Sequence, residues 1–165
     1  MLKASKILNI PVIATTQNRA RLGETCAELN LDTPEGITTL IHADKTLFSM
    51  WTPEVREVLS KLFTPLSCVI VGIESHICVT QTTLDLLREG HKVYILADGV
   101  SSCNKEEIPV ALARLRAEGA VVTTSESWLY ECMGDAGIEE FRAIAKLVKD
   151  TSGTTNDALQ ALAKI

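Results

Sequence analysis

The chain has 165 residues, a length that suits one domain built around a single core. A hydrophobic fraction of 46% excludes a largely disordered chain, and a net charge of −5 without a basic run argues against nucleic-acid binding. No apolar run reaches the length of a membrane-spanning helix.

The first third of the chain alternates short apolar runs with polar segments. A threonine cap, a proline at the first helical position and an acid in the first turn mark a helix that starts at Thr52-Pro53-Glu54 and runs to about Phe63. The segments before it are predicted as the end of a helix (2–9), a buried strand (10–16), a surface loop (16–35) and a short strand (37–41) that leads to Asp44 and Lys45.

The rest of the chain repeats a strand-then-helix pattern. The predicted elements are a strand at 68–73, a helix from Cys78 to near Gly90, a strand at 92–97, a helix at 106–118, a strand at 120–124, and helices at 126–133 and 138–148. Such alternation predicts a parallel sheet covered by helices on both faces. We expect one domain over 1–150, then a polar linker and a short helix over 151–165.

One thiol stands at the place where this fold class puts its ligand sites. The apolar run Val69-Ile70-Val71 ends in Gly72 and a polar turn, and Cys78 follows as a helix begins. The carboxyl end of a buried strand is the usual ligand edge of a parallel sheet, and a helix amino end favours a thiolate. We therefore interpret Cys78 as a nucleophile; the structural alternative is a buried, inert cysteine.

Several motifs, in order, resemble the isochorismatase-like cysteine hydrolases, the superfamily that includes the nicotinamidases. Lys45-Thr46-Leu47-Phe48-Ser49-Met50 resembles the segment that carries the family's lysine, and the segment from Gly72 to Val79 resembles its nucleophile motif. The other matching segments are Thr16-Gln17 through Leu22-Gly23, Thr82-Thr83-Leu84-Asp85-Leu86-Leu87, Asp98-Gly99-Val100-Ser101-Ser102 and Thr123-Thr124-Ser125-Glu126-Ser127.

The resemblance implies a Rossmann-like, three-layer α/β/α fold with six strands in the order 3-2-1-4-5-6. It also implies a triad of aspartate, lysine and cysteine, in which Cys78 is the nucleophile and Lys45 the lysine. The aspartate belongs to an Asp-x-Gln motif on a first strand, which would precede Met1 and is absent from this sequence. That strand would lie between those at 10–16 and 68–73, so we expect two exposed apolar edges. A truncated gene model, a short isoform and a sheet completed in another way are the three explanations.

The resemblance also assigns the remaining site residues. Backbone N–H groups of Glu74 and Cys78 would form the oxyanion hole, and a cis peptide would join Ile73 to Glu74. Apart from the resemblance, we expect Gln17, Phe48 and Trp51 to line the substrate pocket; the alternative for Phe48 and Trp51 is a core or interface position. Lys45 would favour the Cys78 thiolate and stabilise developing negative charge.

The missing aspartate leaves the general base open. His76, Glu74 and Asp44 are the candidates, although each residue type in such a turn is more often a turn or surface group. Asp98 ends a strand at the same edge and is expected either to cap the following loop or to orient its neighbours. His42 and Asp44 do not supply the Asp-x-His cluster of some nicotinamidases, so we expect no metal and no cofactor.

We therefore expect a hydrolase that cleaves a small amide C–N bond through a thioester on Cys78. Two alternatives are a non-catalytic binding or scaffolding member of the family and a thiol redox sensor at Cys78. The expected partners are a small-molecule substrate and further copies of the chain in a homo-oligomer, without nucleic acid or membrane. Five cysteines, none in a C-x-x-C pair, indicate a cytoplasmic location, with a mitochondrial one as the alternative.

Overall fold

The computed structural model describes residues 1–31 and 39–163 and contains two parallel sheets. The first pairs β1 (Val12–Gln17) with β2 (Thr39–Lys45). The second has the order β3-β4-β5, formed by Ser67–Gly72, Lys92–Val100 and Val121–Thr123. The predicted parallel α/β architecture is confirmed.

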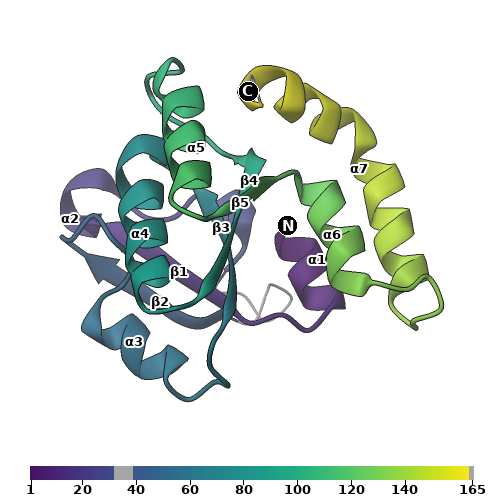
Figure 1. Cartoon of the computed structure of the whole chain (residues 1–165), viewed down its shortest axis with the longest axis horizontal. Coiled ribbons are helices and arrows are strands. Elements are labelled where there is room, and N and C mark those ends of the chain that lie inside the picture. The colour runs from purple at the N-terminus through teal and green to yellow at the C-terminus, as the bar shows by residue number, and fades with distance from the viewer. Residues whose placement is uncertain (32–38, 164–165) are drawn as a thin grey trace.

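Helices cover both faces of the three-stranded sheet (Figure 1). On one face lie α4 (Thr80–Arg88) and α5 (Glu107–Ala117). On the other lie α1 (Leu2–Ile7), α6 (Ser125–Met133) and α7 (Phe141–Leu162). The helix α3 (Pro53–Leu59) packs on β2, and the one-turn α2 (Arg19–Leu22) follows β1.

The central strand β4 divides the core into two clusters because its side chains alternate between the two faces. Val93 and Ile95 face the cluster under α4 and α5, where Leu112 and Leu115 are fully buried. The neighbours of Val93 and Ile95 along the strand face the second cluster; its members are Ala4, Tyr94, Leu96, Trp128, Leu129 and Ile144. This two-sided burial explains why β4 reads as a continuous apolar run.

The two sheets are not joined by strand pairing. Within the described residues, β1 is hydrogen-bonded only to β2, and β3 only to β4. The break between the two sheets lies between β1 and β3. In the family strand order, one further strand lies between these two. The consequence of this break for the site is that Lys45, at the end of β2, and Cys78, after β3, belong to different sheets.

The linker expected from residue 151 is wrong, because α7 continues without a break to Leu162. The hydroxyls of Thr151 and Thr154 donate to the carbonyls of Leu147 and Thr151, so the polar run satisfies its side chains within the helix. Leu162 packs against the cluster under α4 and α5, which makes the end of α7 part of the same unit.

Other element boundaries differ from the sequence expectation. The helix α3 ends at Leu59 instead of near Phe63, and β4 continues through Asp98 to Val100. The loop expected over 16–35 contains α2 and a 3-10 turn at Ala27–Leu29, while residues 32–38 lie outside the described part of the chain. The Thr52 cap is confirmed: its hydroxyl accepts a hydrogen bond from the N–H of Val55 at 3.4 Å.

We predict that Leu112→Ala lowers the free energy of unfolding by about 2–5 kcal/mol, because it removes a fully buried side chain from the core. Val110→Ala, two residues away on the same helix, is the matched control, since Val110 is 65% exposed. Urea unfolding of both variants checks the prediction, and equal losses would show that α5 does not pack as described.

Candidate functional site

Lys45 is a buried cation at the carboxyl end of β2. Its side chain is 8% exposed. The ammonium Nζ donates to Gln17 Oε1 at 2.6 Å, to the Leu47 carbonyl at 2.9 Å and to the Phe48 carbonyl at 3.0 Å. Three acceptors match the three N–H groups of an ammonium, so the geometry holds the protonated form. All three acceptors are neutral.

Gln17 and Asp44 support this lysine from β1 and β2. Gln17 lies opposite Lys45 in the strand pairing, and its Nε2 donates to the Thr46 carbonyl at 2.8 Å. The amide is therefore engaged at both ends, with Lys45 and with Thr46. Asp44 Oδ1 accepts from Thr16 Oγ1 at 3.0 Å and from the Arg19 N–H at 2.9 Å. These contacts fix the end of β1 to the start of the loop that follows β2.

Electrostatics connect Lys45 to Cys78 across the break between the sheets. Burial lowers the pKa of Lys45 below its ordinary value of 10.5, while the negative charges of the Cys78 thiolate and of Asp44 act in the opposite direction. Among the described residues, no carboxylate forms an ion pair with Lys45. Cys78 and Asp44 are thus the groups whose negative charge favours the ammonium form of Lys45.

The lowered pKa of Lys45 gives a pH prediction. Between its folded value and 10.5 the unfolded chain binds more protons at this lysine, so stability rises with pH in that interval. We expect the unfolding free energy of the wild type to increase, relative to Lys45→Met, as the pH is raised toward 10.5. Urea unfolding of both proteins at pH 8 and pH 10 measures this difference, and an opposite slope would contradict the burial of the charge.

Cys78 lies in the turn between β3 and α4. Gly72 ends β3 with φ of 117°, a conformation that favours glycine, and the Ile73–Glu74 peptide is cis. The chain then winds a π-helical turn over Ser75–Val79, which contains Cys78, before α4 begins at Thr80. Cys78 therefore lies inside the first turn of a continuous helical segment. The Thr80 hydroxyl donates to the Ser75 carbonyl at 2.7 Å and closes this turn.

The loop after β4 is hydrogen-bonded to the same turn. The Ser75 N–H donates to the Ser101 carbonyl at 2.8 Å, and the Ser101 N–H donates to the Gly72 carbonyl at 3.1 Å. Ser102 Oγ and His76 Nδ1 are hydrogen-bonded at 2.8 Å. Glu74 Oε2 accepts from the Cys103 N–H at 2.6 Å. Hydrogen bonds therefore join residues 101–103 of the loop to residues 72–76 of the turn.

All three candidate bases have structural partners. Asp44 is engaged with Thr16 and Arg19, and the Arg19 N–H lowers its pKa below the ordinary value. Burial alone would raise the pKa of Glu74, but hydrogen bonds from Cys103 and Ser102 outweigh it, so its pKa is also lowered. His76 uses Nδ1 for Ser102. The contacts favour structural roles for all three: Glu74 and His76 in the turn before α4, and Asp44 between β2 and the start of α2.

Two further predicted residues take clear positions. The Phe48 side chain is 51% exposed beside the lysine, and its carbonyl is one of the three acceptors of the ammonium. Asp98 accepts hydrogen bonds from the N–H and the hydroxyl of Ser125, the first residue of α6. Asp98 therefore orients the start of α6. Of its two expected roles, this is the orientation of neighbouring residues.

Sequence reasoning missed the contacts of Thr82. This residue is 3% exposed on α4, and its hydroxyl donates to the Cys78 carbonyl at 2.6 Å. The same oxygen accepts from the Met50 N–H at 2.9 Å. The available signal was the occurrence of Thr80, Thr82 and Thr83 on one short helix, because threonine is a poor helix former whose hydroxyl often bonds to backbone.

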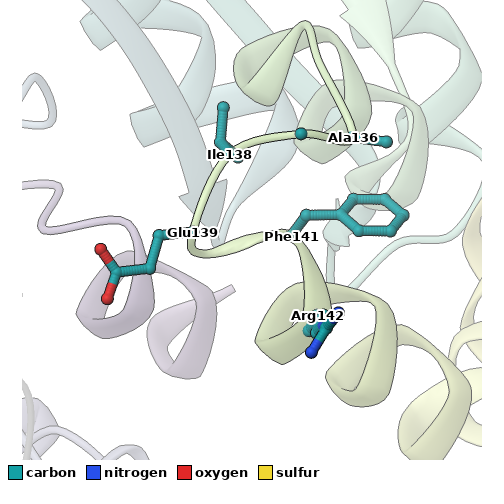
Figure 2. Close-up of a pocket in the computed structure, with 6 residues that line it drawn as sticks. Ala136, Ile138, Glu139, Phe141 and Arg142 are labelled. Carbon is teal, nitrogen blue, oxygen red and sulfur yellow. The ribbon is translucent and has the colours of Figure 1, made fainter.

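A hollow of the described surface lies elsewhere, in the connection between α6 and α7. It measures about 560 Å³ and is lined by Ala136, Gly137, Ile138, Glu139, Phe141 and Arg142. The side chains of Glu139, Phe141 and Arg142 point in different directions (Figure 2). No polar groups converge there, so it offers no catalytic chemistry of its own.

Residues 1–31 and 39–163 contain neither a metal-binding cluster nor a membrane-spanning helix. No group of three or more His, Cys, Asp or Glu side chains is placed to hold a metal ion. No helix combines the length and the hydropathy that crossing a membrane requires.

The fold and the site define the class of this protein. It is a parallel α/β protein with a thiol in the turn after one strand and a buried lysine at the end of another. The chain belongs to the isochorismatase family: a family model of the isochorismatase domain matches residues 1–127. The family predicted from the sequence is thus confirmed.

Relatives and solved structures agree with this assignment. The secreted isochorismatase effector Isc1 of Phytophthora sojae is 40% identical over 151 residues, which are 91% of this chain and 71% of that protein. Isochorismatase domain-containing protein 2 of Xenopus laevis is 41% identical over 150 residues, covering 91% of this chain and 70% of that protein. The structure of MAR1 ribonuclease from Caenorhabditis elegans superimposes with a TM-score of 0.80 at 36% identity, covering 89% of this chain and 73% of that one.

Proposed function

We propose that this chain is a hydrolase that cleaves a small amide C–N bond with Cys78 as nucleophile and no cofactor. The observation that carries the proposal is the buried Lys45 ammonium, which bonds only to neutral acceptors and interacts electrostatically with Cys78. A cation that interacts electrostatically with a thiol favours the thiolate, the form of cysteine that attacks carbon.

The reaction has two stages. The Cys78 sulfur bonds to the carbonyl carbon, and the C=O electron pair moves to the oxygen. The oxyanion collapses, the C–N bond breaks, and the amine leaves with a proton taken from solvent. Water then attacks the thioester, returns the thiolate and releases a carboxylic acid. We propose the Glu74 and Cys78 N–H groups as the oxyanion donors, and Phe48 with Gln17 as the substrate-facing wall.

We propose that the Lys45 charge favours the thiolate form of Cys78. A positive charge favours the ionised form of a thiol with which it interacts. Asp44, Glu74 and His76 then serve as shape-determining residues, in agreement with the hydrogen bonds they form.

A generic acyl donor tests this proposal without knowledge of the natural substrate. We expect p-nitrophenyl acetate to give a burst of p-nitrophenol and an acetyl group on Cys78 that hydroxylamine removes, as a thioester requires. Absence of the adduct on Cys78, with wild-type protein folded, would favour a non-catalytic family member. A panel of small amides, read by amine release, then narrows the substrate.

RNA cleavage is a second candidate, supported by the name of the Caenorhabditis elegans relative. The net charge of −5 opposes it, because phosphate binding needs clustered cations. A fluorophore-quencher RNA included in the same screen separates the two. Cleavage that persists in Cys78→Ser would point to RNA chemistry independent of the thiol.

We also propose that the chain self-associates and acts in the cytoplasm. Leu47, Phe48 and Ile73 are 57%, 51% and 66% exposed at the ends of β2 and β3, an apolar area that a second copy would cover. All five cysteines are free, which suits a reducing compartment. Light scattering after size exclusion tests the first proposal, and a monomeric mass at micromolar concentration would contradict it.

A further inference from the structure

The two halves of the proposed site are carried by separate sheets. Lys45 ends β2 of the two-stranded sheet, and Cys78 follows β3 of the three-stranded sheet. Since β1 and β3 are not paired in the described structure, the strand ladder does not fix the distance from the ammonium to the sulfur. Other contacts must set that distance.

One buried hydroxyl bridges the two halves. Thr82 Oγ1 accepts from the Met50 N–H at 2.9 Å and donates to the Cys78 carbonyl at 2.6 Å. A hydroxyl has one donor and two acceptor sites, so both bonds form at once. Met50 ends the segment that Lys45 itself binds through Leu47 and Phe48. The hydroxyl therefore joins the loop around the ammonium to the backbone of the nucleophile.

We infer that Thr82 is a positioning residue that holds the Lys45 loop against the Cys78 turn. The inference rests on the proposed function and adds a residue that acts through Lys45 and not on substrate. A second side-chain hydrogen bond joins this loop to the C-terminal end of α4, from Trp51 Nε1 to Glu89 Oε1 at 3.4 Å. It is longer than the two bonds of Thr82 and is exposed to solvent. Thr82, at 3% exposure, is shielded from competing water.

Thr83 provides an internal control. It is the next residue on the same helix and is fully buried, and its hydroxyl has no hydrogen-bond partner among the described residues. Threonine-to-valine is nearly isosteric and removes the hydroxyl in both cases. Thr82→Val deletes the bridge, whereas Thr83→Val removes a buried polar atom that bonds to nothing.

The test is alkylation of Cys78 by iodoacetamide, resolved by peptide mapping and followed from pH 5 to 10. We expect Thr82→Val to slow Cys78 labelling at pH 7 by about three- to tenfold and to move its pH profile upward, because a displaced ammonium favours the thiolate less. Thr82→Ser, which retains the hydroxyl, should label like the wild type. Thr83→Val should label like the wild type and unfold at the same or a higher temperature.

The Lys45→Met background separates positioning from a general structural effect. There we expect Thr82→Val to cause no further slowing, because the charge it positions is gone. An equal slowing in both backgrounds, a wild-type profile for Thr82→Val, or an equal effect of Thr83→Val would overturn the inference. If Lys45→Met itself leaves Cys78 labelling unchanged, the proposed function fails instead.

A measurement on the wild type keeps the inference testable if Thr82→Val does not fold. The Met50 N–H donates to the Thr82 hydroxyl, so hydrogen exchange should show this amide protected. Exchange at the rate of a solvent-exposed loop amide would show that the bridge is not formed, and would overturn the inference without any variant.

Discussion

Cys78→Ser is expected to abolish acyl-adduct formation and amide turnover. A serine hydroxyl is not ionised near neutral pH, and the described site contains no base in contact with this position to activate it. Removal of a nucleophile from a hydrolytic site costs at least about 1,000-fold in turnover, since binding and oxyanion contacts alone remain. The measurement is amine release from the best amide of the screen, with intact mass to follow the adduct.

Cys132→Ser is the control for this prediction. Cys132 is an exposed free thiol on α6, and its substitution should leave turnover unchanged. Turnover that survives in Cys78→Ser, or that is lost in Cys132→Ser, would assign the chemistry to another residue. Circular dichroism of both variants confirms that each retains the wild-type secondary structure.

Lys45→Met is expected to produce the second-largest effect, a slowing of Cys78 alkylation at pH 7 by about 10- to 100-fold. The estimate follows from an opposite charge shifting a nearby titration by about 1–3 pH units, moderated by the higher intrinsic reactivity of a more basic thiolate. Methionine fills a similar volume and removes the charge. The substitution also leaves Gln17 Oε1 and two carbonyls without their donor, so unfolding is measured in parallel.

Two other lysine substitutions separate charge from shape. Lys45→Arg keeps the charge, and we expect it to retain part of the rate, since a guanidinium cannot reproduce the three-acceptor geometry of the ammonium. Lys61→Met removes an exposed surface lysine that pairs with Glu57 and should change nothing. A rate for Lys45→Met equal to that of Lys61→Met would remove the electrostatic basis of the proposed mechanism.

The sequence predicted those parts of the fold that depend on local pattern. The apolar run of β4 and the glycine that follows α4 indicated a buried parallel strand and a helix end, and the structure has both. The failure at residues 151–162 also has a local cause. Serine, threonine and glycine favour turns on average, but here the hydroxyls bond to carbonyls of the preceding turn, and Leu162 is held by the core.

Part of the candidate site was equally accessible from sequence. Cys78 and Lys45 were identified from motifs, and the structure brings them within electrostatic interaction. The Gln17–Lys45 contact joins residues 28 apart and the Met50–Thr82 contact residues 32 apart. The first contact depends on the register between β1 and β2, and the second on how the two sheets are placed; no single segment encodes either. For this reason the sequence did not predict that the Gln17 amide is engaged with Lys45 and Thr46.

Site-resolved alkylation of all five cysteines in the wild type tests the central claim most directly. Cys26, Cys103 and Cys132 are exposed, while Cys68 and Cys78 are partly buried. Burial raises the pKa of Cys68, while partial burial of the thiol and the charge of Glu131 raise the pKa of Cys132, which slows both near neutral pH. If Lys45 activates the nucleophile, Cys78 reacts first at pH 7 although three other thiols are more accessible. If Cys26 and Cys103 react first and Cys78 follows in order of exposure, Cys78 is an ordinary thiol and the proposed mechanism is wrong.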